Sequence, residues 1–174
     1  MQRIIFLISI VMLLAGCGIT IGWYNISNFV LPDDNEFLAL IEELNTPFWI
    51  AEYMQENFEY KYSSYAKSPY QLWKTKKGDC NDFSLFGTFM AHCNGYDTWQ
   101  IRVTFKDSKT NHWLGVYKAK NQSLYTYTTN QYYGNEKSSF EKIVNAHCKF
   151  NDRNWLKYEV YNYNMILVEE KTQP

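Results

Sequence analysis

Apolar residues recur at helical spacing in three segments of the chain after residue 31. They lie about 3.6 positions apart, as on the buried face of an amphipathic helix. The segments follow residues typical of helix starts: Pro32-Asp33-Asp34, Thr46-Pro47 and Ser68-Pro69. A capping residue followed by proline is typical of the first turn of a helix. We therefore predict helices over about 34–44, 47–58 and 69–73.

The segment from Cys80 to Cys93 is predicted to be a fourth helix, buried in the core. Its apolar face is formed by Phe83, Phe86 and Met90. Asp79 can cap its first turn, with Asp82 completing the cap, and Asn94-Gly95 can end it. Cys80 is therefore predicted to be the first residue of this helix.

After residue 95 the period of the pattern changes from 3.6 to 2, which predicts strands. The predicted strands are 99–105, 112–118 and 124–128, separated by short polar turns. They are followed by a helix from a capping box at Ser138-Ser139-Phe140-Glu141 to about Cys148, and by a hairpin of 158–161 and 165–168. Helices followed by an antiparallel meander predict an α+β fold, in which the cysteine helix packs on an antiparallel sheet.

The amino-terminal segment has the pattern of a signal sequence. Arg3 precedes an apolar run over 4–14, and Leu14-Ala15-Gly16-Cys17 follows and resembles the lipobox of bacterial lipoproteins. We expect residues 1–16 to be a lipoprotein signal peptide, Cys17 to carry the lipid, 17–31 to be a tether and 32–174 to be the domain. Alternatively, the uncharged run over 4–23 is long enough for a signal anchor. Both interpretations place the domain at the cell membrane, on the extracytoplasmic side.

Composition favours one folded domain and argues against nucleic acid as a partner. The 174 residues are 46% hydrophobic and 18% aromatic, which is enough to build a core. The formal net charge is −1, and no basic stripe exists that could neutralise phosphates.

A cysteine at a helix amino terminus lies near unpaired backbone N–H groups, which stabilise the reactive thiolate. Cys80 has this position, and its general base has to come from one of three histidines. His92 is twelve residues further along the same helix, about 18 Å away. His147 lies within the late helix beside Cys148, whereas His112 begins a strand that can lie next to the cysteine. His112 is therefore the predicted base.

An imidazole base needs a third group that fixes its orientation. Asn130, at the end of the strand after that of His112, fits this role, with Thr128 as an alternate. A zinc site of Cys80, His112 and His147 is the competing interpretation, but the chain lacks a close-spaced ligand pair. We expect no metal and no cofactor. Cys93 and Cys148 are interpreted either as a disulfide or as two buried thiols.

The order Gly78-Asp79-Cys80-Asn81-Asp82, Gly95-Tyr96 and His112-Trp113 resembles the transglutaminase-like superfamily, whose fold is that of papain-like cysteine peptidases. The resemblance covers about residues 68–130. It implies Cys80 as nucleophile, His112 as base and Asn130 at the position of the usual aspartate. It also implies an oxyanion site made by the backbone N–H of Cys80, with Gln71 or Trp73 as side-chain candidates.

The implied reaction is attack of Cys80 on an amide carbonyl, which leaves a thioester for water or an amine to resolve. The chain would then be a peptidase or amidase, or an acyltransferase of transglutaminase type. Its partner would be a protein or peptide substrate, including a cell-wall peptide. The alternative is a catalytically inactive binding module that keeps the fold.

Overall fold

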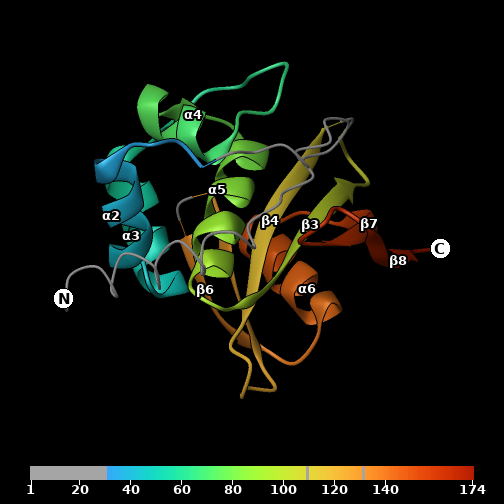
Figure 1. Ribbon diagram of the computed structural model, residues 1–174. Helices are drawn as coiled ribbons and strands as arrows, with labels where there is room; N and C mark the ends of the chain where they lie inside the picture. Colours follow the sequence, from blue (N-terminus) through green and yellow to red (C-terminus); the bar gives the residue numbers. More distant parts are fainter. Residues whose placement is uncertain (1–30, 109, 131) are drawn as a thin grey trace.

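The computed structural model describes residues 31–108, 110–130 and 132–174. It contains helices on both faces of an antiparallel sheet, which confirms the predicted α+β fold (Figure 1). The helices are α2 (Asn35–Glu43), α3 (Pro47–Asn57), α4 (Pro69–Thr75), α5 (Cys80–Cys93) and α6 (Phe140–Phe150). The predicted signal peptide, Cys17 and most of the tether lie outside the described residues.

The main sheet has six strands in the order β6-β5-β4-β3-β7-β8, and every neighbouring pair is antiparallel. The strands are β3 (Asp97–Phe105), β4 (Asn111–Lys118), β5 (Tyr125–Thr129), β6 (Tyr132–Lys137), β7 (Trp155–Asn162) and β8 (Leu167–Thr172). Two short strands, β1 (Glu59–Tyr60) and β2 (Lys77–Gly78), form a separate parallel pair. The predicted meander and the closing hairpin are confirmed.

The predicted helix starts are confirmed, but one predicted cap is wrong. Thr46, Ser68 and Asp79 are N-cap residues whose side chains accept hydrogen bonds from backbone N–H groups of the first turn. The capping box predicted with Glu141 does not form. Ser139 is the N-cap of α6, its hydroxyl accepts from the N–H of Lys142, and Glu141 instead pairs with Lys171.

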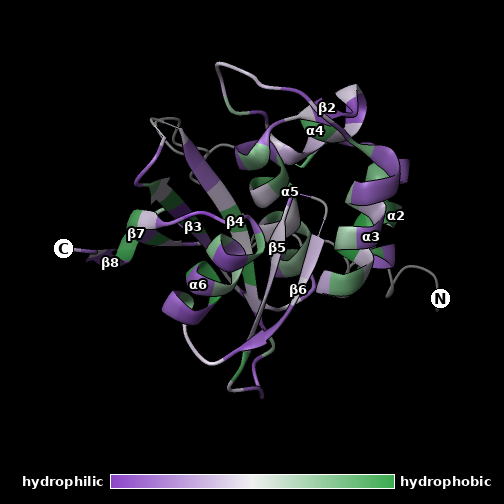
Figure 2. Ribbon diagram, turned by 180° about the vertical axis from the view of Figure 1, so that it is seen from behind, coloured by the Kyte–Doolittle hydropathy of each residue, from purple (hydrophilic) through white to green (hydrophobic). Residues whose placement is uncertain are grey.

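The alternating pattern of the strands divides the apolar side chains between two clusters, one on each face of the sheet. Ile101, Val103 and Leu114 belong to the cluster beneath α6. Tyr117, one position out of phase with Leu114, belongs to the cluster with α2 to α5. In Figure 2 green hydrophobic and purple hydrophilic segments alternate along α3 and α6. Burial of apolar surface is the main favourable term for this packing.

The middle of α5 approaches β4 closely because glycine is present on both sides of the contact. A Cβ atom on Gly87 would lie 2.3 Å from the hydroxyl oxygen of Tyr117, and one on Gly115 would lie 2.5 Å from it. That hydroxyl is buried and hydrogen-bonded to the hydroxyl of Thr128 at 2.6 Å. The two glycines therefore allow the helix that begins with Cys80 to lie close against β4.

Among the helices of the described part of the chain, none is both long and apolar enough to cross a bilayer.

The disulfide considered for Cys93 and Cys148 does not form within the described residues. Cys93 ends α5, and Cys148 lies in α6.

Candidate active site

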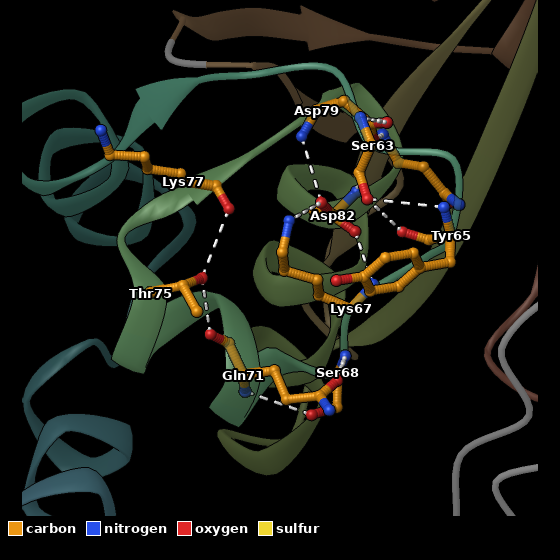
Figure 3. Close-up of polar contacts among 10 residues, drawn as sticks. Ser63, Tyr65, Lys67, Ser68, Gln71, Thr75, Lys77, Asp79 and Asp82 are labelled. Atoms are coloured by element: carbon orange, nitrogen blue, oxygen red, sulfur yellow. Dashed lines mark hydrogen bonds and ion pairs between the residues drawn. The ribbon is translucent and has the colours of Figure 1, made fainter.

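Cys80 is the first residue of α5, and its position is fixed by a reciprocal cap. The carboxylate of Asp79 accepts from the N–H groups of Asn81 and Asp82, and the Asp82 carboxylate accepts from the N–H of Asp79 at 3.1 Å. Asp82 is fully buried and also accepts from the backbone N–H of Lys67 at 2.7 Å and from its ammonium group (Figure 3). The loop before α4 and the start of α5 are therefore held together around one carboxylate.

The Cys80 sulfur is enclosed on several sides and only 8% of the residue is exposed. Burial, together with the nearby Asp79 carboxylate, raises the pKa of its thiol to about 11. The backbone N–H groups of Trp113, Asn81 and Cys80 itself act in the opposite direction. The helix amino terminus thus favours the thiolate as expected from the sequence, but desolvation outweighs it, so the resting group is a thiol.

A phenol that the sequence analysis did not consider also contacts the sulfur. The pairing of β1 with β2 places Tyr60 opposite Gly78, two residues before Cys80. Its hydroxyl hydrogen-bonds with Cys80, and its ring lies 6.2 Å from that of Phe83. Burial raises the pKa of the Tyr60 hydroxyl, so that it remains a hydrogen-bond donor at neutral pH.

His112 is held between a hydroxyl and a second imidazole. Its Nε2 lies 2.9 Å from Oγ1 of Thr129, and its ring stacks on that of His147 with centroids 4.7 Å apart and planes within 2°. Burial, together with the charges of His147 and Arg153, lowers the pKa of His112 to about 3. His112 is therefore a neutral imidazole, and its Nδ1 is the ring nitrogen left to accept a proton.

One cavity of about 630 Å³ brings most of these groups together. Its lining includes all three residues predicted to form the catalytic set: Cys80, His112 and Asn130. Tyr60, Thr129 and His147 line it as well. Exposed aromatic side chains of Tyr62, Tyr132 and Phe150 stand at its wall.

The predicted third residue, Asn130, lies in the cavity without bonding to His112. It follows β5 in a left-handed conformation, with φ of 49°, and its Oδ1 is buried without a hydrogen-bond partner among the described residues. The hydrogen bond to the imidazole comes instead from the neighbouring Thr129. The alternate, Thr128, bonds to Tyr117 on the other face of the sheet.

The two predicted side-chain donors of the oxyanion site do not reach the cavity. Gln71 is exposed on α4, where it completes the capping box with Ser68. Trp73 is buried in the apolar cluster, where its ring packs on Phe37. Tyr60 is the side-chain donor that the structure places beside the sulfur.

The residues proposed for a zinc site share the cavity walls but are not arranged as ligands. Within residues 31–108, 110–130 and 132–174, no group of three or more His, Cys, Asp and Glu side chains is placed to hold a metal ion. His112 and His147 stack face to face, a geometry in which their ring nitrogens do not converge on one point.

Comparison with known proteins identifies the family of the chain. Residues 42–160 match the family model described as the transglutaminase-like superfamily, and the chain belongs to this superfamily. Residues 1–17 match the model described as the prokaryotic membrane lipoprotein lipid attachment site, which is the signal of a lipid-anchored membrane protein. No curated protein matches the chain in sequence.

Solved structures of low sequence identity are similar to the chain. Legionella pneumophila LapG is 15% identical with a TM-score of 0.49, and the match covers 71% of each chain. A candidate cysteine protease from Cytophaga hutchinsonii is 10% identical with a TM-score of 0.49, over 80% of this chain and 52% of the other. The assignment to the superfamily rests on the family model.

Proposed function

We propose that this protein is a lipid-anchored cysteine enzyme that acts on amide bonds outside the cytoplasm, with Cys80 as nucleophile and His112 as base. The observation that carries the proposal is the shared cavity, where the first residue of α5 presents a thiol and the second residue of β4 presents a neutral imidazole. The acyl donor would be a protein or peptide, including a cell-wall peptide.

The protonation states favour a mechanism in which proton transfer accompanies attack. The thiol proton of Cys80 passes to Nδ1 of His112 as the sulfur bonds to the carbonyl carbon and the carbonyl electron pair moves to oxygen. The resulting imidazolium then protonates the departing amine as the C–N bond breaks. A thioester remains, and water or a second amine attacks it and releases the thiol.

The surroundings supply groups for each stage of this reaction. The backbone N–H of Cys80 and the hydroxyl of Tyr60 are the donors proposed for the oxyanion, in place of Gln71 and Trp73. Thr129 holds the imidazole through Nε2. We assign Asn130, whose Oδ1 lacks a partner among the described residues, to accept a hydrogen bond from an N–H of the substrate.

The competing function is a binding module that keeps the fold without the chemistry. The raised pKa of the Cys80 thiol favours it, because a buried neutral thiol is a weak nucleophile when no base assists it. The two functions differ in whether His112 increases the reactivity of the sulfur toward a carbonyl.

Acylation by p-nitrophenyl acetate tests the proposal without knowledge of the natural substrate. We expect release of p-nitrophenolate together with one acetyl group on Cys80, located by peptide mass spectrometry. His112→Gln should slow this acylation about 100-fold or more, as general-base catalysis contributes roughly 10² to 10⁴. Cys148→Ser is the matched control for a second buried thiol and should leave the rate unchanged. Equal rates in the parent protein and in His112→Gln would support the binding module.

A further inference from the structure

An uncharged aromatic patch lies on the surface where α3 meets the edge strand β6. It consists of Phe48, Trp49 and Tyr133, which are 45%, 54% and 38% exposed. The ring of Phe48 packs edge to face on both others, with centroids 5.2 Å from Trp49 and 5.8 Å from Tyr133. Three large rings are thus held rigidly at the surface, where clustered exposed apolar groups usually mark a binding surface.

The position of the lipid attachment site limits what this patch can meet. The lipid would be on Cys17, and thirteen residues separate it from Leu31, the first described residue. Even fully extended, thirteen residues span at most about 45 Å. A domain of this size is itself about 40 Å across. The domain therefore stays within about its own diameter of the bilayer, at an effective concentration in the millimolar range, where weak contacts suffice.

The side chains of the patch are of the kind that binds the interface of a lipid bilayer. Trp, Tyr and Phe are the side chains that prefer the boundary between lipid headgroups and hydrocarbon. Charge does not explain binding here, because α3 carries Glu52 and Glu56, and Glu136 and Lys137 of β6 offset each other, which leaves a net negative charge that an anionic surface repels.

We propose that the patch of Phe48, Trp49 and Tyr133 docks on the membrane surface and orients the domain relative to its lipid anchor. Tyr132, the neighbour of Tyr133 on β6, lines the cavity of Cys80. Side chains of consecutive strand residues point to opposite faces, so docking through Tyr133 leaves the Tyr132 side of β6, which lines that cavity, facing away from the patch. This inference does not depend on the proposed catalytic function.

Binding to phosphatidylcholine vesicles tests the proposal. The chain from residue 17 onward, with Cys17→Ser so that no lipid is attached, is sedimented with vesicles at low and high salt. We expect salt-insensitive binding, which the double variant Phe48→Ser/Trp49→Ser weakens about tenfold, since two half-exposed rings lose their burial. Phe48→Tyr/Trp49→Tyr should restore binding to within about threefold.

The far edge of the sheet provides a matched control. Ile166 and Leu167 are 59% and 47% exposed beside and on β8, which lies on the opposite side of the molecule from α3 (Figures 1 and 2). Ile166→Ser/Leu167→Ser should bind like the parent chain. All variants should unfold at the temperature of the parent, as followed by circular dichroism.

Three results would overturn the proposal. The first is vesicle binding that Phe48→Ser/Trp49→Ser leaves unchanged, which would assign it to residues 17–30 or to another surface. The second is no binding of the parent chain at millimolar lipid. The third is a change of oligomeric state in light scattering, caused by the same double variant without an effect on vesicle binding, which would identify a second copy as the occupant.

Discussion

The imidazole of His112 lies flat against that of His147, with centroids 4.7 Å apart and planes within 2°. Burial lowers the pKa of His112 to about 3 and that of His147 to about 4. Two charged rings at this separation would repel each other, and Arg153 disfavours both charges. Both imidazoles are therefore neutral in the folded protein at pH 7. Their protonation on unfolding makes the stability of the protein depend on pH.

Acid should destabilise the protein well above the pH at which carboxylates are protonated. In the unfolded chain both histidines have a pKa near 6.5, so between about pH 6.5 and 4 the unfolded state binds more protons than the folded state. Stability is fully present above pH 6.5 and is lost as pH falls. We expect the free energy of unfolding in urea to drop by about 1 kcal/mol or more per histidine between pH 7 and 5.

Substitution of one ring separates this effect from general acid denaturation. His147→Gln should reduce the loss of stability between pH 7 and 5 by about half. His92→Gln should reduce the loss as well, because burial also lowers the pKa of His92, whose ring stacks on Tyr163 away from this pair. A loss of stability that is the same in the parent and in His147→Gln would contradict a neutral buried pair.

Alkylation of Cys80 by iodoacetamide should report a thiol, not a preformed ion pair. Iodoacetamide reacts with the thiolate, whose fraction rises tenfold per pH unit below the pKa. With the pKa of the thiol raised to about 11, the rate should rise about tenfold per unit from pH 7 to 10. Mass spectrometry of the Cys80 peptide follows the rate. A rate that is already constant near pH 7 would show a thiolate–imidazolium pair and exclude this protonation state.

The hydroxyl of Thr129 should matter for catalysis through the orientation of His112. Thr129→Val keeps the shape of the side chain but removes the partner of Nε2, and we expect acylation of Cys80 by p-nitrophenyl acetate to slow about tenfold, as for one lost hydrogen bond. Thr129→Ser should retain the rate to within about threefold. Asn130→Ala should slow this small ester less than Thr129→Val does, and the reverse order would return the orienting role to Asn130.

The sequence predicts the elements of this site well because their signals are local. Asp79 and Asn94-Gly95 mark the ends of the cysteine helix, and the change from period 3.6 to period 2 marks the sheet. The strand β6 escapes prediction because Tyr-Tyr-Gly-Asn-Glu-Lys has no apolar alternation. It is a strand because it pairs with β5, which is a non-local cause.

Thr129 could not be identified from the sequence as the partner of His112, because its position depends on the register between β4 and β5. Gly115 pairs with Thr128, so Thr129 continues opposite Leu114 and shares the face of His112, while Asn130 falls on the opposite parity. Tyr60 reaches Cys80 because β1 pairs with β2, and His147 reaches His112 because α6 covers the sheet. These contacts depend on tertiary packing, so no spacing of residues along the sequence predicts them.

The close approach of α5 to β4 gives a final prediction about the fold. A methyl group at position 115 would overlap the Tyr117 hydroxyl, which is fully buried and cannot move away, so Gly115→Ala should destabilise the protein by about 2 kcal/mol or more. Tyr117→Phe removes that oxygen and its hydrogen bond to Thr128, at a cost of about 1 kcal/mol.

Because both substitutions act on one contact, their effects should not add. The double variant Gly115→Ala/Tyr117→Phe should be more stable than the sum of the two single losses by about 1 kcal/mol, since the added methyl group then meets no hydroxyl. Urea unfolding of the four proteins at pH 7.5 measures this coupling. Simple additivity would show that the methyl group is resisted by Thr128, whose hydroxyl oxygen would lie 3.1 Å from it, and not by the Tyr117 hydroxyl.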